Sequence, residues 1–177
     1  MENPNSRTLA NHDLARAHFH SMSKFFLLIC VLALSACADN TEPGTATVRK
    51  VIDGDTIELR IGTSNETVRL LGIDTPETVH PTKPVECFGP EASARTKELL
   101  PRGSKVRIER DTEARDHFGR LLLYVYLGDR MVNEILLSEG FARPLSIEPN
   151  TAHATRFERL SNEARAASAG LWGACRQ

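Results

Sequence analysis

Residues 48–73 read VRKVIDGDTIELRIGTSNETVRLLGI, and these residues give the clearest indication of the chain's architecture. Its middle segment, Thr56–Ile61, alternates apolar and charged side chains, which is the period-two pattern of a strand with one buried face. Asp53-Gly54-Asp55 and the GTSN turn at 62–65 separate this segment from its apolar neighbours. The stretch therefore predicts a meander of three consecutive strands, over Val48–Ile52, Thr56–Ile61 and Thr67–Ile73.

The sequence that follows predicts three helices and two further strands. A proline-rich loop over Pro76–Phe88 precedes the first helix, since Pro90 suits a first helical position, where its missing N–H is not needed. The other elements expected are strands over Val106–Glu109 and Leu121–Tyr126 and helices over Val132–Glu139 and Thr151–Ser168. A helix between the third and fourth of five strands is the arrangement of an OB-fold barrel. The fold class expected is α+β, mainly β: a five-stranded OB-fold barrel with three helices.

The composition excludes several classes of protein. The chain has 177 residues, 41% of them hydrophobic and 25% charged, which is close to the globular average and argues against a disordered or fibrous chain. Its formal net charge is −1, so any binding of nucleic acid must depend on a local cluster of basic residues rather than on bulk positive charge.

The N-terminal residues have the pattern of an export signal. The apolar run Phe25–Leu34 follows Lys24; it is too short to span a bilayer and has the length of a signal-peptide core. It ends in Leu34-Ser35-Ala36-Cys37, which resembles the lipobox of bacterial lipoproteins, where the cysteine receives lipid. Ordinary secretory cleavage after the small residues is the alternative. We expect an exported protein, anchored to the membrane of the cell envelope through Cys37, with a leader at 1–36, a lipidated tether at 37–44 and one domain at 45–177.

Two cysteines remain in the expected domain, Cys87 and Cys175. In an exported protein they can pair as a disulfide, which would tie the end of the chain to the proline-rich loop. Such a bond stabilises a fold by constraining the unfolded chain. Two free thiols are the alternative.

Three short clusters carry acids and arginines suited to phosphate chemistry. Asp53-Gly54-Asp55-Thr56 places two carboxylates on one side of an extended chain, where they can serve a hard cation. Residues 69–77, RLLGIDTPE, add an arginine and two acids around a stiff proline turn, and 116–120, DHFGR, add a second arginine. Each cluster alone also fits a structural role, as a turn or a solvated charge. Together they supply the groups that phosphodiester hydrolysis requires.

Five motifs in this order resemble the staphylococcal nuclease (thermonuclease) family, here in a bacterial lipoprotein form. The resemblance extends from about Thr45 to Trp172, and the barrel with three helices that it implies agrees with the elements expected above. The matching residues are 51–56 (VIDGDT), 69–78 (RLLGIDTPET), 89–94 (GPEASA), 116–120 (DHFGR) and 131–134 (MVNE).

Carried over by position, the resemblance implies a calcium site. The carboxylates of Asp55 and Asp74 and the backbone carbonyl of Thr75 would bind Ca²⁺, and Asp53 would support them from nearby. Ca²⁺ is the only cofactor implied.

The resemblance also implies a reaction and the residues that perform it. Glu77 would act as general base or position the attacking water, and Arg69 and Arg120 would hold the scissile phosphate. The implied activity is that of an endonuclease which hydrolyses DNA and RNA, preferably single-stranded, to 3′-phosphate products. We expect a monomer with no protein partner.

Two departures bear on nucleotide binding. Phe118 stands where relatives carry a tyrosine, and residues 143–149, RPLSIEP, contain no tyrosine either. Phe118 can still stack on a base, but a phenol that would donate to phosphate is lost. An OB-fold module that binds nucleic acid without cleaving it, and a structural lipoprotein, are therefore the alternative functions. The presence of Arg69, Glu77 and Arg120 together favours the enzyme.

Overall fold

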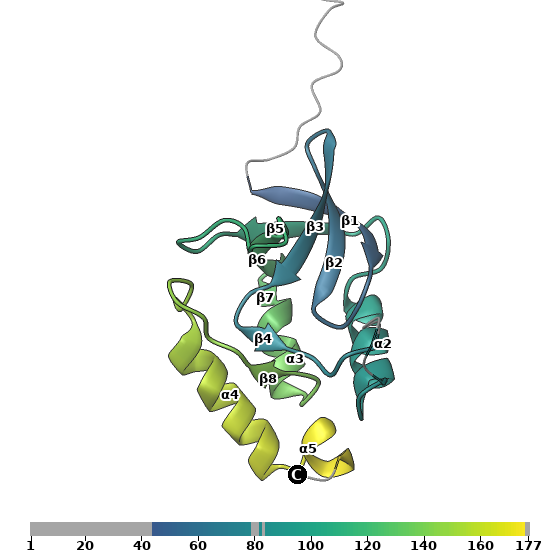
Figure 1. Cartoon of the computed structure of the whole chain (residues 1–177), viewed down its shortest axis with the longest axis vertical. Helices are drawn as coiled ribbons and strands as arrows, with labels where there is room; N and C mark the ends of the chain where they lie inside the picture. Colours follow the sequence, from purple (N-terminus) through teal and green to yellow (C-terminus); the bar gives the residue numbers. More distant parts are fainter. Residues whose placement is uncertain (1–43, 79–81, 83, 176–177) are drawn as a thin grey trace, which may run out of the picture. The chain divides into compact units, whose positions relative to one another are not determined.

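The computed structural model describes residues 44–78, 82 and 84–175, and they contain a closed barrel (Figure 1). The sheet order is β3-β2-β1-β5-β6-β7. A parallel pairing of β3 with β6, with Val68 opposite Leu121 and Leu70 opposite Leu123, closes the barrel. The five barrel strands are β1 (Thr45–Val51), β2 (Thr56–Ile61), β3 (Ser64–Leu70), β5 (Lys105–Glu109) and β6 (Leu121–Leu127). The predicted five-stranded OB-type barrel is confirmed.

Three two-residue strands complete the sheets, and one of them changes a predicted boundary. β4 (Ile73–Asp74) pairs with β8 (Arg143–Pro144), and β7 (Arg130–Met131) pairs with the end of β6. The sequence predicts one strand from Thr67 to Ile73, whereas the structure ends β3 at Leu70. Gly72 adopts a φ of 72°, which is incompatible with an extended strand, and so separates β4 from β3.

The three predicted helices are present, and a fourth short one follows them. They are α2 (Gly89–Leu99), α3 (Val132–Ser138), α4 (Ala154–Ala166) and α5 (Leu171–Ala174). α4 begins three residues later than the prediction, and α5 is a single turn that the sequence analysis did not separate from the chain end. The fold remains mainly β, with the helices packed around the barrel (Figure 1).

The core lies inside the barrel and beneath α3. Val48, Leu59 and Leu123 are fully buried at its centre. From α3, the buried Asn133 donates to the carbonyl of Leu71 at 2.9 Å and accepts from the Val125 N–H at 3.1 Å. This side chain therefore connects the helix to two backbone groups of the barrel and satisfies both.

A smaller apolar cluster joins the chain end to the start of α2. The buried residues Leu171, Trp172 and Ala164 form it, and Phe88 packs against them. Cys87 and Cys175 form a disulfide beside this cluster, with their Cα atoms 6.0 Å apart. The pairing of the two cysteines agrees with the prediction.

None of the helices within residues 44–78, 82 and 84–175 has the length and apolar character needed to cross a membrane. The predicted leader, the tether and Cys37 lie outside the described residues, and they stay predictions.

Candidate active site

Asp55 is the most firmly held carboxylate of the site. It is 8% exposed and lies at the bend between β1 and β2. Its Oδ2 accepts from the N–H and the hydroxyl of Thr75 at 2.9 and 3.1 Å, and its Oδ1 accepts from the Thr56 hydroxyl at 3.0 Å. A Cβ on the neighbouring Gly54 would lie 2.5 Å from the Thr75 hydroxyl oxygen. The glycine predicted to allow a close approach does so here, and the bend packs directly on Thr75.

Arg69 joins Asp55 to Asp74. Its Nη2 lies 3.1 Å from Asp55 Oδ2 and 3.0 Å from Asp74 Oδ1. Its Nη1 donates to the carbonyl oxygens of Leu70 at 2.9 Å and Ile73 at 2.7 Å. Both terminal nitrogens are thus bonded within the protein, and the guanidinium neutralises two acids that would otherwise repel each other.

The donor set around Asp74 fits a hard cation. Burial raises the pKa of Asp74 above its ordinary value; the nearby Arg69 opposes this, while the carboxylates of Asp55 and Glu86 add to it. A cation bound there would favour the ionised carboxylates, and carboxylate and carbonyl oxygens are the ligands that Ca²⁺ prefers. The described residues hold no group of three or more His, Cys, Asp or Glu arranged to bind a metal. A cation at this place would therefore need further oxygen ligands from the backbone, water or substrate.

Asp53 and Glu77 form a second acidic pair next to the first. Asp53 is 5% exposed and accepts from the Gly54 N–H at 2.8 Å, from the Thr78 N–H at 3.2 Å and from the Thr78 hydroxyl. Burial raises its pKa, but hydrogen bonds with the carboxyl of Glu77, with Thr78 and with Gly54 outweigh burial and lower the pKa below the ordinary value. Asp53 thereby holds the segment on which Glu77 is carried.

Arg120 directly precedes the first residue of β6. Its Nε donates to Asp116 Oδ2 at 2.7 Å, and its backbone N–H donates to Asp116 Oδ1 at 2.9 Å. Burial raises the pKa of Asp116, but these bonds and the charge of Arg120 lower it below the ordinary value. The ion pair uses Nε, so within the described part of the chain the two terminal nitrogens of Arg120 carry no protein bond. They are the donors available to an anion.

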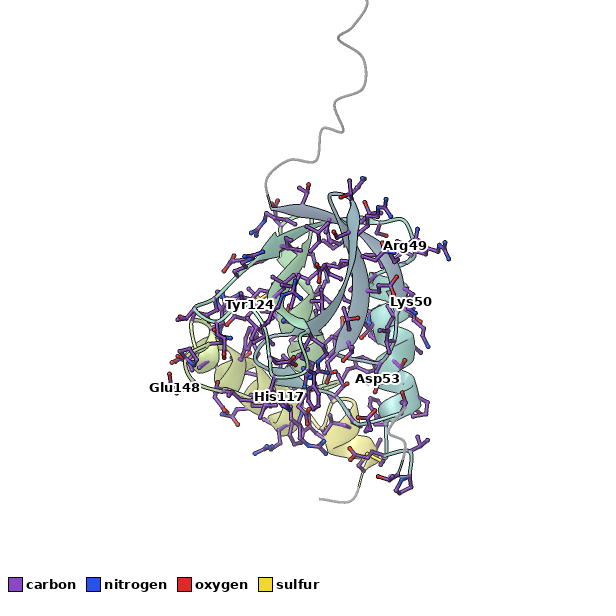
Figure 2. All side chains as sticks on the ribbon, turned by 45° about the horizontal axis from the view of Figure 1, so that its top comes forward. Arg49, Lys50, Asp53, His117, Tyr124 and Glu148 are labelled. Atoms are coloured by element: carbon purple, nitrogen blue, oxygen red, sulfur yellow. A yellow bond between two sulfur atoms is a disulfide. The ribbon has the colours of Figure 1, made fainter. Side chains whose placement is uncertain are left out.

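A pocket of about 360 Å³ is lined by both Arg69 and Arg120. Figure 2 labels Asp53, at the bend between β1 and β2, and His117, in the turn before β6. Phe118 is 71% exposed, and its ring centroid lies 5.3 Å from the Arg120 guanidinium carbon. The pocket lining also includes Asp116, His117, Leu122, Leu145, Ile147 and Asn150.

The structure groups most of the predicted residues into two clusters. Asp55, Asp74, Thr75 and Arg69 form one cluster, and Asp53 and Glu77 form the other. Arg120 lies outside both clusters and lines the same pocket as Arg69.

The sequence analysis assigned no supporting role to Asp116, Thr78 or Thr96. The spacing of four residues between Asp116 and Arg120 is the one signal that could have revealed their ion pair. Thr78, which bonds to Asp53, and Thr96, whose hydroxyl donates to the Gly54 carbonyl at 2.6 Å, act over 25 and 42 residues of sequence and have no local signal.

Comparisons with known proteins identify relatives of this chain. Residues 67–174 match the family described as "Staphylococcal nuclease homologue". The chain is 41% identical over 138 residues to the protein named Thermonuclease of Staphylococcus hyicus, which covers 78% of this chain and 81% of that protein. It is 44% identical over 125 residues to the Thermonuclease of Staphylococcus intermedius, covering 71% and 74%. It is 42% identical over 128 residues to Endonuclease YncB of Bacillus subtilis (strain 168), covering 71% and 60%.

The barrel, the arginine and carboxylate site and these relatives define a phosphodiester hydrolase of the nuclease class. The chain belongs to the staphylococcal nuclease family. Nucleic acid is the substrate class that this membership implies, and the family is in general metal-dependent.

Proposed function

We propose that this chain is a calcium-dependent endonuclease that hydrolyses DNA and RNA, preferably as single strands, and leaves 3′-phosphate ends. The observation that carries the proposal is the bridge from Arg69 to Asp55 and Asp74, with Arg69 and Arg120 lining the same pocket. A cation site and two arginines beside one pocket are the groups that stabilise a phosphate gaining negative charge.

The cation would be held by Asp55, Asp74 and the carbonyl of Thr75. The buried hydrogen bonds from Thr75 fix the Asp55 carboxylate before any ion arrives, which reduces the ordering that binding requires. When bound, Ca²⁺ would neutralise a phosphate oxygen and lower the pKa of a water molecule next to it.

The chain's own residues would perform the proton and charge transfers. Glu77 accepts a proton from the attacking water, or orients that water, while the new P–O bond forms opposite the 5′ oxygen. The bond from phosphorus to the 5′ oxygen then breaks, the leaving oxygen takes up a proton, and the phosphate stays on the 3′ side. The terminal nitrogens of Arg120 donate to the phosphate oxygens as their charge increases.

Arg69 must exchange a partner to take part. Because both of its terminal nitrogens are bonded within the protein, contact with a phosphate oxygen replaces a carboxylate contact or uses Nε. We infer that Arg69 keeps the acids paired before substrate arrives and binds phosphate afterwards.

The apolar part of the pocket lining suits a nucleobase. Leu145 and Ile147 are 40% and 63% exposed beside the pocket, and Phe118 offers an exposed ring next to Arg120. Apolar and aromatic surfaces bind any base through its flat face, so they favour single strands over paired ones. This lining supports activity on both DNA and RNA.

We also propose export and membrane anchoring through lipid on Cys37, from the lipobox-like residues 34–37. The test is fractionation of cells that express the full chain or Cys37→Ser. We expect the variant to leave the membrane fraction and keep its nuclease activity. A variant that stays with the membranes would contradict lipidation.

The nuclease proposal is tested by cleavage of single-stranded DNA with Ca²⁺ and with a chelator, followed by analysis of the product ends. We expect cleavage only with Ca²⁺, 3′-phosphate products, and a fall in turnover of about a thousandfold in Glu77→Gln. Glu91→Gln is the matched control, because Glu91 is an exposed carboxylate on α2 outside the site. A folded protein that binds DNA without cleaving it would instead support the binding-module alternative.

A further inference from the structure

Glu86, three residues before the start of α2, lies against the backbone of Glu77. The Glu86 N–H donates to the Glu77 carbonyl at 2.9 Å, and the Glu86 Oε2 accepts from the Glu77 N–H at 3.3 Å. Glu86 thus contacts both backbone polar groups of Glu77. The position of the Glu77 carboxyl depends on this backbone, because its side chain extends from it.

The segment that begins at Glu86 is packed closely on the Glu77 backbone. A Cβ on Gly89 would lie 2.9 Å from the Glu77 carbonyl oxygen and 3.1 Å from the Pro76 carbonyl oxygen. Gly89 also donates to the Glu86 carbonyl at 3.1 Å, which closes a turn over residues 86–89. A displacement of this turn would therefore move the Glu77 backbone with it.

The turn is fixed from outside by the end of the chain. Cys87 lies inside it and is bonded to Cys175, directly after α5, across 88 residues of sequence. Next to it, Phe88 stacks on Phe141 with ring centroids 5.3 Å apart and packs on the cluster of Leu171 and Trp172. In Figure 1, α5 lies below α2, at the side of the molecule where this cluster is formed.

The hydrogen bonds between Glu86 and Glu77 would by themselves hold this turn only weakly. Glu86 and Cys87 are exposed, so water competes for the bonds between Glu86 and Glu77. Exposed segments with few buried contacts open locally at low free energy. The covalent bond to Cys175 limits how far residues 86–89 can move when those hydrogen bonds break. The hydrogen bonds and ion pairs that hold Asp55 and Asp74 come from Arg69 and Thr75, which lie outside this turn.

We propose that the Cys87–Cys175 disulfide and Glu86 position the Glu77 carboxyl, so that reduction of the disulfide lowers turnover while the cation ligands stay in place. The proposal rests on the nuclease function proposed above. A dithiol reductant supplies two electrons and two protons: the S–S bond breaks, two thiols form on Cys87 and Cys175, and the dithiol closes to a cyclic disulfide. Because Cys87 is exposed, such a reductant can reach it.

The first experiment compares the full chain in its oxidised form with the chain reduced by dithiothreitol and blocked with iodoacetamide. We expect kcat to fall about tenfold, since small misplacements of a catalytic group are costly, while KM changes less than about twofold. The double variant Cys87→Ala with Cys175→Ala, treated in the same way, should start at the lower kcat and not respond. An equal kcat in the oxidised and reduced forms would overturn the proposal.

The second experiment tests whether the effect passes through Glu77. In a Glu77→Gln background, reduction should cause no further loss of the residual turnover; a further tenfold loss would overturn the positioning role. Absence of cleavage in every form, oxidised included, would instead refute the nuclease function itself.

A third measurement does not depend on turnover or on the folding of a variant. Hydrogen exchange of the wild-type chain should become faster at the Glu86 amide after reduction, while the amide of Leu123 in β6 keeps its rate, because Leu123 lies in the barrel. Unchanged exchange at Glu86 would contradict the proposal.

Discussion

The acidic side of the site, around Asp55, and its arginine side, around Arg120, are built in different ways. On the acidic side, Asp55 is buried, and its partner Thr75 lies 20 residues further along the chain. On the arginine side, Arg120 is held by Asp116, only four residues away, in a largely exposed turn. Contacts between distant parts of the chain therefore hold Asp55, whereas a local contact holds the turn that carries Arg120. We infer that the acidic side is the rigid one and that the arginine side can adjust.

Among the changes that test this contrast, replacing the arginine on each side with lysine should have the largest effects. Lysine has a point charge and cannot reproduce the planar fork, so both Arg69→Lys and Arg120→Lys should lower kcat about a hundredfold. Arg69→Lys should also lower the free energy of unfolding by about 3 kcal/mol, because it removes the guanidinium that pairs with the buried Asp55 carboxylate. Arg120→Lys should lower it by less than about 1 kcal/mol, as its ion pair is partly exposed.

The measurements are steady-state cleavage kinetics and urea unfolding of the two variants. The control is Arg102→Lys, since Arg102 is exposed in the turn after α2 and outside the site. Equal losses of stability at the two arginines would refute the contrast between a rigid and an adjustable side.

The same contrast explains how much the sequence alone could predict. The alternation in Thr56–Ile61 predicts β2 with its correct bounds, because a strand with one buried face leaves a local pattern. The boundary of β3 was predicted wrongly. It begins at Ser64 after a tighter turn and ends before Gly72, which has a positive φ. Because Gly72 has no side chain, Phe157 of α4 can pack against it: a Cβ at this position would lie 2.5 Å from the ring. That packing depends on a helix 85 residues away and has no local signal.

In the candidate site, too, some features have a local signal in the sequence and others have none. The acids and arginines were found from motifs, and a disulfide between Cys87 and Cys175 was one of two alternatives. The way Arg69 binds both Asp55 and Asp74 could not be predicted, since it depends on the closed barrel and the β4 pairing. The sequence therefore reveals the acids and arginines that can take part in the reaction, but the partners of these side chains depend on tertiary contacts.

A smaller effect is expected at the exposed ring of the arginine side. Phe118→Ala should raise KM for single-stranded DNA about fivefold and leave kcat and stability unchanged, because an exposed ring that stacks on a base contributes only to binding. Phe118→Tyr retains the ring and should keep KM low. Cleavage kinetics over a range of substrate concentrations test this, with Leu127→Ala as an exposed apolar control. A Phe118→Ala variant with unchanged KM would show that bases bind elsewhere.

The smallest effect concerns the contact that ties the arginine side to the barrel. Asp111 Oδ2 accepts from the Tyr124 hydroxyl at 2.8 Å and from the Ala152 N–H at 3.0 Å. Burial raises the pKa of Asp111, but these hydrogen bonds and those from Thr112 outweigh burial and lower it. A carboxylate whose pKa is lower in the folded state stabilises the fold above its unfolded pKa of about 3.9, and this stabilisation is lost as the pH falls through the folded value.

Asp111→Asn should therefore lower the free energy of unfolding by about 1 kcal/mol at neutral pH, and the difference from the wild-type chain should shrink below about pH 4. Urea unfolding at a series of pH values measures this difference. Asp129→Asn, at an exposed carboxylate in the turn between β6 and β7, is the matched control. A loss at Asp111 that stayed constant down to pH 2 would mean that its geometry, not its charge, holds the segment around Ala152. The arginine side would then be attached to the barrel by neutral hydrogen bonds at this position, with no contribution from the charge of Asp111.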